Sequence, residues 1–401
     1  MAKLLQINVC IAAKSTGRIA EQIGQLAMEN GFDSYIAYGD ETHPSKSVSI
    51  KIGTNFERLL HRVANRFFDL QGRASYFATK RFLKKVDEIK PDIVHLHNLH
   101  CCYLNYRLLF DYLVNNNIPI VWTLHDCWSM TGSCAHFDFV GCNKWKTGCR
   151  NCKQRLKFRL DNSSSNYALK KKTFTRPENM TVVPVSNWLG GIVKESYLSK
   201  YNVQVIYNGV DLNVFRPMPQ NDLKNKLNIA PDKFILLGVG TAWSNEKGLR
   251  EFIELSRNNQ YQVVLVGVSD ELKQQLPSEI ISIAKTDSQQ ELADYYSMAD
   301  VLVNPTYNDS FPTVNLEALA CGTPVITYRT GGSPEAVNEN TGIVVSRGDV
   351  DGLKNAVESL RIEDEMQVSI RRKQCRERAE IMFDKNARYN DYMNLYKSIL
   401  K

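Results

Sequence analysis

The chain has 401 residues, 43% of them hydrophobic, a composition typical of a globular protein with two or three domains and sizeable cores. No apolar run reaches the ~18 residues that a spanning helix needs, so the sequence predicts no transmembrane segment. The net charge of +7 includes a tract, residues 144–176, with eleven Lys and Arg against one acidic residue. No nucleic-acid-binding motif accompanies this charge, so we expect no nucleic-acid partner.

The chain begins with MAKLLQINVCIAA, in which Gln6 and Asn8 interrupt the apolar run. This pattern predicts a first strand rather than an export signal. Ten cysteines without an export signal indicate a reducing compartment, so we expect a cytoplasmic protein without a disulfide framework.

Apolar runs alternate with helical patterns along the first half: KLLQINVCIA, a helix over 17–30, DSYIAYG, PDIVHLHN, a helix near 103–116, IPIVWTLHD, MTVVPVS and VQVIYNG. The second half restarts with KFILLGVG, YQVVLVGV, IISIAKT, DVLVNP, TPVITY and TGIVV, and only helical pattern follows residue 350. The alternation predicts an α/β protein with two doubly wound, Rossmann-like parallel-sheet domains facing each other across a cleft. We expect domains at 1–208 and 209–380, the link NGVDLNVFRPMPQND, and a C-terminal helix in 381–401 that packs back on the first domain.

The stretch FERLLHRVANRFFDLQGRASYFATKRFLKK mixes apolar residues with Arg and Lys at roughly helical spacing; the apolar ones include Leu59, Leu60, Phe67, Phe68 and Phe77. This pattern fits a helix pair lying on an anionic membrane surface. The alternative is an ordinary helix with a buried apolar face and a basic solvent face. The first interpretation makes the protein peripheral on the inner face of the cell membrane.

The tract NDSFPTVNLEALACGTPV places two carboxylates, Asp309 and Glu317, eight positions apart. It follows the apolar run VLVNP, so Asp309 is expected in a strand-to-helix loop and Glu317 in the first turns of the helix. Such loops lie at the carboxyl edge of a parallel sheet, where ligands bind, and a helix start offers free N–H groups to an anion. Neither a nicotinamide fingerprint nor a P-loop occurs in the chain.

Asp309, Glu317, Ala318, Gly322 and TPVI together resemble the signature of the family 4 glycosyltransferases, retaining enzymes of the two-domain GT-B fold. Glu246-Lys247-Gly248, GGSPEAV with Glu335, IYNGVD and His125-Asp126 are also similar to that family and occur in the expected order. Within the family, HDCWSMTGSC looks most like bacterial polysaccharide-assembly enzymes of the colanic-acid type. The resemblance covers essentially the whole chain.

By this resemblance, Glu317 binds the ribose hydroxyls of a nucleotide-sugar donor, Asp309 contacts the donor sugar and Lys247 pairs with the diphosphate. The family usually has Glu where this chain has Asp309, and an Arg shortly before the Lys, where this chain has Trp243 and Ser244. Backbone N–H groups after Phe311, together with Arg329, are candidates to replace that Arg. The resemblance implies further donor contacts from Gly240, Trp243, Ser310, Phe311, Pro312, Thr313 and Glu335.

A diphosphate that leaves an anomeric carbon gathers negative charge, and groups aimed at that charge are usually the largest catalytic contribution. Lys247 and a helix N-terminus can supply such groups, and no Asp-x-Asp pair follows a strand, so we expect no divalent ion in catalysis. Retention is expected from same-face attack, with a leaving phosphate oxygen taking the acceptor proton. His125, at the end of IVWTL, is expected to touch the donor sugar's hydroxyls from the opposite domain.

The loop AAKSTGRIAEQ also lies at a carboxyl edge and offers Ser15, Thr16 and Gly17 to an acceptor. In HLHNLH, strand alternation puts His95 and His97 on one face, a pattern that could also suggest metal ligands. We prefer a polar rim of the acceptor cleft, formed with Asn98 and His100.

Four cysteines in CAHFDFVGCNKWKTGCRNC have the spacing C-x7-C-x6-C-x2-C: Cys134, Cys142, Cys149 and Cys152. The tract lacks apolar content for a core of its own, and four thiolates around a structural zinc could hold it. Paired disulfides and free thiols are the alternatives.

The sequence therefore predicts a glycosyltransferase that moves a sugar from a UDP- or GDP-sugar to a glycan or polyprenyl-linked oligosaccharide. A sugar-nucleotide epimerase on the same fold, or a catalytically silent nucleotide-sugar-binding partner, are the alternatives.

Overall fold

The computed structural model describes residues 1–219 and 223–401, so the last three residues of the predicted link lie outside it. The chain divides into two compact units: unit 1 holds residues 1–207 and 386–401, and unit 2 holds residues 208–385. Every strand pairing in the described residues is parallel. The predicted fold class, two doubly wound parallel-sheet domains, is confirmed.

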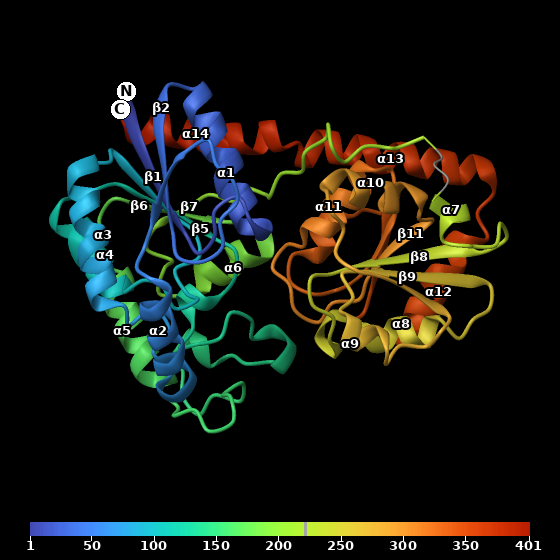
Figure 1. Cartoon of the computed structure of the whole chain (residues 1–401), viewed down its shortest axis with the longest axis horizontal. Coiled ribbons are helices and arrows are strands. Elements are labelled where there is room, and N and C mark those ends of the chain that lie inside the picture. Colours follow the sequence, from blue (N-terminus) through green and yellow to red (C-terminus); the bar gives the residue numbers. More distant parts are fainter. Residues whose placement is uncertain (220–222) are drawn as a thin grey trace. The chain divides into compact units, whose positions relative to one another are not determined.

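Unit 1 is built on a seven-stranded sheet in the order β3-β2-β1-β4-β5-β6-β7 (Figure 1). The strands are β1 (Ala2–Asn8), β2 (Phe32–Tyr38), β3 (Val48–Lys51), β4 (Ile93–Leu96), β5 (Ile120–Leu124), β6 (Met180–Pro184) and β7 (Asn202–Val203). The helices are α1 (Lys14–Glu29), α2 (Asn55–Phe68), α3 (Tyr76–Ile89), α4 (Tyr106–Asn115), α5 (Ser163–Phe174), α6 (Asn187–Glu195) and α14 (Lys385–Ile399), with short 3-10 turns η1 (Trp128–Met130), η2 (Asp138–Val140) and η3 (Lys144–Lys146).

The last helix, α14, belongs to the core of unit 1 although it is the end of the chain. Figure 1 shows it in red beside the blue β1 and α1. Tyr389, Tyr392, Met393 and Tyr396 are buried in one cluster with residues of α1 and of the central strands. Burying large aromatic side chains is strongly favourable, so this cluster ties α14 to the sheet.

Unit 2 is built on a six-stranded sheet in the order β10-β9-β8-β11-β12-β13. The strands are β8 (Phe234–Val239), β9 (Tyr261–Val266), β10 (Ile280–Ile283), β11 (Val301–Asn304), β12 (Val325–Tyr328) and β13 (Gly342–Val345). The helices are α7 (Leu223–Lys226), α8 (Leu249–Leu255), α9 (Asp270–Lys273), α10 (Gln289–Met298), α11 (Thr313–Ala320), α12 (Val350–Arg361) and α13 (Glu365–Phe383), with 3-10 turns η4 (Asn245–Lys247) and η5 (Ser333–Ala336).

None of the helices in the described ranges has both the length and the apolar content needed to cross a bilayer.

Candidate functional site

The strand order of unit 2 reverses between β8 and β11. From β8 the chain proceeds to β9 and β10 on one side, whereas β12 and β13 follow β11 on the other. The loops that leave β8 and β11 therefore diverge, and in open parallel sheets the crevice between such loops is the usual ligand site. The loop after β8 leads to η4, and the loop after β11 leads to α11.

Lys247 joins these two loops. Its Nζ lies 3.1 Å from Asp309 Oδ2 and 3.2 Å from the carbonyl oxygen of Asn308. Glu246 adds a second link, since its carbonyl oxygen accepts from Tyr307 N at 2.8 Å and its carboxylate accepts from Asn308 Nδ2 at 3.1 Å. The ammonium group of Lys247 is thus held where the strand order reverses, and the Lys247 side chain is 42% exposed.

The position after Lys247, Gly248, can hold only a glycine without strain. Its φ is +80°, and a Cβ at this position would lie 2.3 Å from Cγ of Pro305. Any larger residue would push the η4 loop away from the β11 loop. The Glu-Lys-Gly triplet therefore has a structural reason in addition to the charge that it presents.

Glu317 and Asp309 occupy different environments, although both come from the same tract. Asp309 lies in the β11–α11 loop with its side chain about one-quarter exposed, whereas Glu317 lies inside α11 and is buried. The hydroxyl of Tyr296, from α10, donates to Glu317 Oε2 at 2.8 Å. The predicted placement of both carboxylates, one in the loop and one in the helix, is confirmed.

The loop after β12 packs directly on the backbone of Asp309 and Ser310. Gly332 N donates to the Ser310 carbonyl at 3.0 Å. Gly331 has φ +53°, and a Cβ there would lie 1.8 Å from the Asp309 carbonyl oxygen. Gly331 therefore allows the two backbones to approach each other, and the Gly332 hydrogen bond helps to fix the position of the Asp309 loop.

A buried hydrogen-bond network connects the segments that carry these loops. Asn304 Nδ2 donates to Asn315 Oδ1 at 2.8 Å, Asn315 Nδ2 donates to Ser333 Oγ at 2.9 Å, and Ser333 Oγ lies 2.6 Å from Thr327 Oγ1. The network connects β11, α11, β12 and η5, and Glu335 is half-buried in η5. Satisfied buried networks of this kind rigidify a site.

Other predicted donor residues have mainly packing roles in the structure. Trp243 donates its indole N–H to the Val266 carbonyl at 3.1 Å and packs edge-on against Phe252. Phe311 is buried against Phe383 of α13, and Gly240 N donates to the Val266 carbonyl. Pro312 and Thr313 begin α11, and Arg329 is exposed after β12.

A chain of hydrogen bonds in unit 1 determines the tautomer of His125. Gln6 Nε2 donates to the Ala20 carbonyl at 2.8 Å, so the atom that faces His97 Nε2 at 3.1 Å is the Gln6 amide oxygen. Because this oxygen can only accept, His97 carries its proton on Nε2 and its Nδ1 accepts from His125 Nε2, 3.1 Å away. Burial lowers the pKa of His125 to about 4. His125 is therefore neutral near pH 7, with a lone pair on Nδ1.

His100 and Asp126 form an ion pair beside this chain, with 2.8 Å between His100 Nε2 and Asp126 Oδ2. Burial opposes protonation of His100, but the Asp126 carboxylate prevails and raises the His100 pKa to about 10. Burial likewise opposes ionisation of Asp126, but His100 lowers the Asp126 pKa to about 2. Asp126 also accepts from Trp128 N at 2.8 Å, so the pair joins the loops after β4 and β5.

The prediction that His95 and His97 line the rim of a cleft is wrong, because both side chains are buried. Tyr396, from α14, lies 2.6 Å from His95 Nδ1, and Thr123 lies 2.8 Å from His95 Nε2. Both rings therefore belong to the interior of unit 1. Sequence alternation correctly placed them on one face but did not show that α14 covers that face.

The predicted acceptor loop lies beside the end of β4. Asn8 Nδ2 donates to the Cys10 carbonyl at 2.9 Å and to Thr16 Oγ1 at 3.4 Å, and Asn8 Oδ1 accepts from Asn98 N at 3.4 Å. Ser15 is exposed, and Gly17 is buried against the backbone of Cys10. Asn8 thus brings together the Thr16 and Asn98 segments, which the sequence assigned to the acceptor side.

Cys134, Cys142, Cys149 and Cys152 are free thiols in the structure. Cys149 Sγ accepts from Gly132 N at 3.1 Å, and the buried Lys170 interacts electrostatically with Cys134 and Cys149. In the described part of the chain, no three His, Cys, Asp or Glu side chains stand in an arrangement that could hold a metal. The structural zinc stays a prediction that rests on the cysteine spacing alone, beside the alternatives of disulfides and free thiols.

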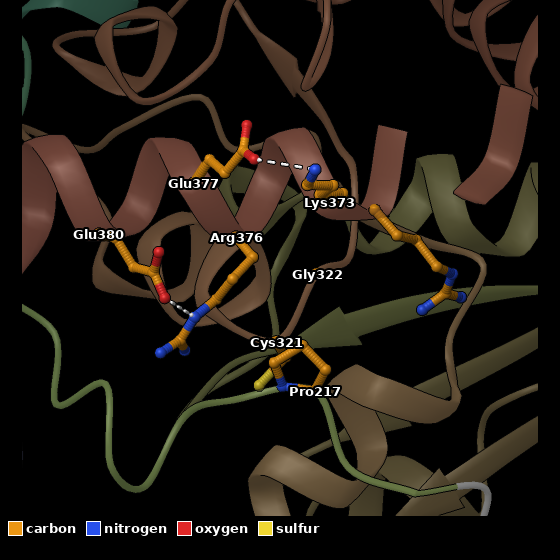
Figure 2. A pocket seen from close by; sticks show the side chains of 8 residues that line it. Pro217, Cys321, Gly322, Lys373, Arg376, Glu377 and Glu380 are labelled. Atoms are coloured by element: carbon orange, nitrogen blue, oxygen red, sulfur yellow. Dashed lines mark hydrogen bonds and ion pairs between the residues drawn. The ribbon is translucent and has the colours of Figure 1, made fainter. Parts of the chain in front are cut away.

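A cavity of 390 Å³ in unit 2 lies apart from these loops (Figure 2). It is lined by Cys321 and Gly322, at the opposite end of α11 from Thr313, and by α13. Four of its charged side chains form two pairs, Arg376 with Glu380 and Lys373 with Glu377, and Arg372 donates to the Ala299 carbonyl at 2.6 Å. The cavity is therefore not part of the candidate donor site.

Several residues that support the loops of the two units gave little or no signal in the sequence. Gln6, Tyr296 and Lys170 lie in ordinary strand or helix segments, and their roles depend on partners far along the chain. Lys170 donates to the carbonyl oxygens of Trp128 and Thr131, and burial lowers its pKa to about 7. The interruption of the first apolar run by Gln6 was the only hint for any of them.

Comparison with known families gives two matches that together cover most of the chain. Residues 17–214 match the model described as Glycosyltransferase Family 4, and residues 219–382 match Glycosyl transferases group 1. The chain is also 25% identical over 375 residues to WcaC of Escherichia coli K12, assigned to colanic acid biosynthesis as a glycosyl transferase. That alignment covers 86% of this chain and 88% of WcaC.

Solved structures show the same fold. Sucrose-phosphate synthase from Thermosynechococcus elongatus superposes with a TM-score of 0.76 at 20% identity, covering 100% of this chain and 99% of that one. Anabaena HepE in complex with UDP-glucose gives a TM-score of 0.69 at 16% identity, covering 99% of this chain and 100% of that one.

Proposed function

Because the chain belongs to the family 4 glycosyltransferases, we propose that it moves a sugar from a UDP- or GDP-sugar to a glycan or lipid-linked oligosaccharide acceptor. The similarity to WcaC supports a role in the synthesis of a cell-surface polysaccharide. The main observation behind this proposal is that the ammonium group of Lys247 contacts Asp309 where the strand order of unit 2 reverses. Glu317 lies eight residues after Asp309.

The donor is proposed to bind at the carboxyl edge of β8 and β11. Lys247 and the N-terminus of α11 both offer positive charge to a diphosphate. Glu317, oriented by Tyr296, is proposed to accept hydrogen bonds from the ribose hydroxyls, and Asp309 to contact the donor sugar. The UDP-glucose complex of HepE, which has the same fold, supports a nucleotide-sugar donor.

The proposed reaction retains the anomeric configuration. The bond between the anomeric carbon and the diphosphate oxygen breaks, and the acceptor oxygen bonds to the same face of the sugar. The acceptor proton passes to the leaving phosphate oxygen. Lys247 stabilises the negative charge that develops on the diphosphate, an effect that preorganised groups commonly supply at several kcal/mol. No divalent ion has a role in this proposal.

In unit 1, we propose that His125 accepts a hydrogen bond from a sugar hydroxyl through Nδ1. The hydrogen bonds between Gln6 and His97 and between His97 and His125 keep that nitrogen unprotonated, which supports this role. Ser15, Thr16, Gly17 and Asn98 are proposed to contact the acceptor. The enzyme is proposed to work at the inner face of the cell membrane, where lipid-linked acceptors are available.

A donor screen tests the proposal. The purified chain is incubated with UDP- and GDP-sugars without acceptor, and products are identified by mass spectrometry. Slow hydrolysis to the free sugar and nucleoside diphosphate supports a transferase, and NMR of the first-formed sugar should show the donor's anomeric configuration. Isomerised donor would instead indicate an epimerase, and binding without any product would indicate a silent nucleotide-sugar-binding protein.

A further inference from the structure

Helix α2 is turned with its polar side toward the protein. Its residues Phe56, Leu59, Leu60, Val63 and Phe67 lie within one 100° arc of the helix and are all exposed; we call them the α2 face. Phe56 is 67% exposed and Leu60 53%. A helix on a globular surface normally buries such an arc, so this orientation is unusual.

Specific contacts hold the polar side of α2 inward. Arg58 is buried, and its Nη2 lies 2.7 Å from Asp40 Oδ1. His61 is 1% exposed and is hydrogen-bonded through both ring nitrogens, to Ser75 Oγ at 2.7 Å and to the Leu70 carbonyl at 3.0 Å. An ion pair and two hydrogen bonds thus anchor the polar side of α2, and this anchoring leaves the α2 face exposed.

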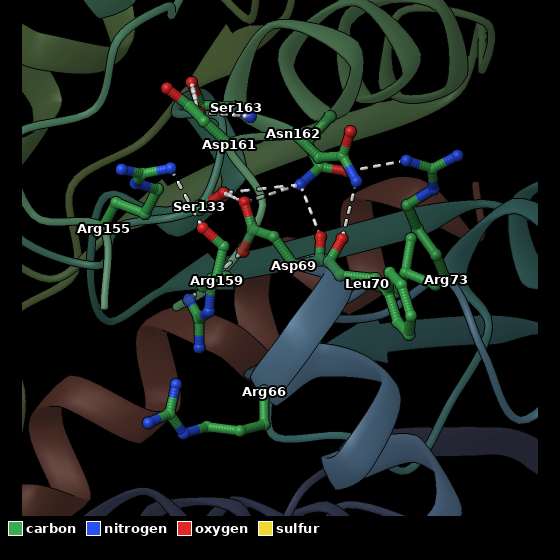
Figure 3. Close-up of polar contacts among 12 residues, drawn as sticks. Arg66, Asp69, Leu70, Arg73, Ser133, Arg155, Arg159, Asp161, Asn162 and Ser163 are labelled. Atoms are coloured by element: carbon green, nitrogen blue, oxygen red, sulfur yellow. Dashed lines mark hydrogen bonds and ion pairs between the residues drawn. The ribbon is translucent and has the colours of Figure 1, made fainter. Parts of the chain in front are cut away.

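The loop of residues 153–160 extends this surface. Leu160 N donates to the Phe67 carbonyl at 2.8 Å, and Arg66 Nη1 donates to the Lys157 carbonyl at 2.8 Å. Figure 3 shows how Arg159 and Asn162 converge on Asp69 and the C-terminal end of α2. Leu156, Phe158 and Leu160, in this loop at the C-terminal end of α2, are all exposed.

Positive charge surrounds these apolar side chains. Residues 153–160 contain four basic residues and no acidic one. On α2, Arg62 and Arg66 border the apolar arc, and the adjacent α3 is tied to α2 by Arg81 and Glu57, 2.6 Å apart. Lys80 and Lys84 of α3 are exposed on the same side of that helix as Phe77. Lys157 Nζ lies 5.0 Å above the ring of Phe158.

From this arrangement we propose that the α2 face and the 153–160 loop form a docking surface for an anionic lipid bilayer. The α2 face enters the headgroup–acyl boundary, while the surrounding Arg and Lys side chains contact lipid phosphates. The basic residues around the α2 face indicate which partner binds there, because an anionic surface complements their charge and a neutral apolar partner does not. The inference deepens the membrane location proposed above and rests on it, but lipid binding can be measured without sugar transfer.

The test uses the full chain in vesicle co-sedimentation. Vesicles of phosphatidylcholine alone are compared with vesicles that contain phosphatidylglycerol. We expect at least about a tenfold preference for the anionic vesicles, since each basic residue near such a surface contributes about fivefold. The preference should fall as salt shortens the screening length from about 10 Å at 0.1 M to about 3 Å at 1 M.

The double variant Phe56→Ser/Leu60→Ser should bind anionic vesicles about tenfold or more weakly, because two apolar side chains no longer enter the lipid. The matched control is Met366→Ser/Ile370→Ser on α13, since these residues are 73% and 51% exposed and also lie four positions apart. The control should bind as the wild type does. Equal binding to both vesicle types, no binding to either, or an unchanged Phe56→Ser/Leu60→Ser variant would overturn the proposal. The proposal would also be overturned if the wild type and the control were dimers in sedimentation velocity and Phe56→Ser/Leu60→Ser were a monomer, because the α2 face would then bind a second copy of the chain.

Discussion

The ion pair between His100 and Asp126 predicts a specific loss of stability at alkaline pH. The His100 pKa rises from 6.5 to about 10 in the folded chain. Its stabilisation is therefore fully present below pH 6.5 and is lost as pH rises toward 10. Each tenfold change in a protonation equilibrium is worth 1.36 kcal/mol, so the full effect is at most about 5 kcal/mol. On the acid side, the Asp126 contribution is present above pH 3.8 and is lost as pH falls toward 2.

The perturbation is Asp126→Asn, which keeps the shape of the side chain and an acceptor for Trp128 N. Without the carboxylate, His100 has no charged partner, so the variant should lose most of its pH dependence between 6.5 and 10. At pH 6, we expect the variant to be less stable by about 3 kcal/mol, the range seen when a buried pair loses one partner. Near pH 10 the two proteins should differ far less.

Urea unfolding followed by tryptophan fluorescence measures this difference. Four of the five tryptophans belong to unit 1, so the signal reports mainly the unit that holds the pair. Other groups that titrate above pH 8, such as tyrosines and cysteines, are common to both proteins and cancel in the comparison. Parallel stability curves for wild type and Asp126→Asn from pH 6 to 10 would refute the reasoning.

Three further predictions concern the two sites and the cysteine tract. Nitrogen-15 NMR of the wild-type protein should show His125 as the neutral Nε2–H tautomer between pH 6 and 8. An Nδ1–H signal would contradict the hydrogen-bond directions assigned from Gln6 through His97. Gly331→Ala should destabilise unit 2 by about 2 kcal/mol or more and weaken UDP binding, because its Cβ would meet the Asp309 carbonyl oxygen at 1.8 Å. Gly141→Ala, at φ +59° with no atom within 4 Å, is the control for backbone strain alone, and an equal effect would contradict the close-approach argument. The cysteine spacing alone predicts a zinc on Cys134, Cys142, Cys149 and Cys152, so elemental analysis of protein purified without chelator should show about one zinc per chain; metal-free protein with four freely reactive thiols would agree with the arrangement in the structure and exclude this site.

The layout of unit 2 could be predicted because its signals are local. The valine- and leucine-rich run before Asn304 marks β11, and Pro312 followed by helical spacing marks α11. These two elements alone place Asp309 in a loop and Glu317 in a helix. Parallel-sheet geometry then places the loop at the carboxyl edge.

The interior of unit 1 could not be predicted in the same way, because its contacts join distant parts of the chain. His95 is covered by Tyr396, which lies 301 positions later. Helix α2 shows a helical apolar period, which normally indicates a buried face. Its orientation depends instead on Arg58 and His61, whose partners are Asp40, Leu70 and Ser75. Periodicity identifies a face, but it does not show which face the tertiary contacts bury.

The central claim is that Lys247 and Glu317 act on a nucleotide-sugar donor, and one comparison tests it most directly. Wild type, Lys247→Ala, Glu317→Gln and the surface control Lys273→Ala are compared for stability and for turnover of the donor found in the screen. The pair between Lys247 and Asp309 is partly exposed, so its loss should cost less than about 1 kcal/mol of stability. Loss of a group that stabilises the transition state costs about 3 kcal/mol, so Lys247→Ala and Glu317→Gln should lower kcat/KM about a hundredfold or more. Lys273→Ala should match wild type; turnover near the wild-type rate in folded Lys247→Ala or Glu317→Gln would contradict the assignment of the donor site.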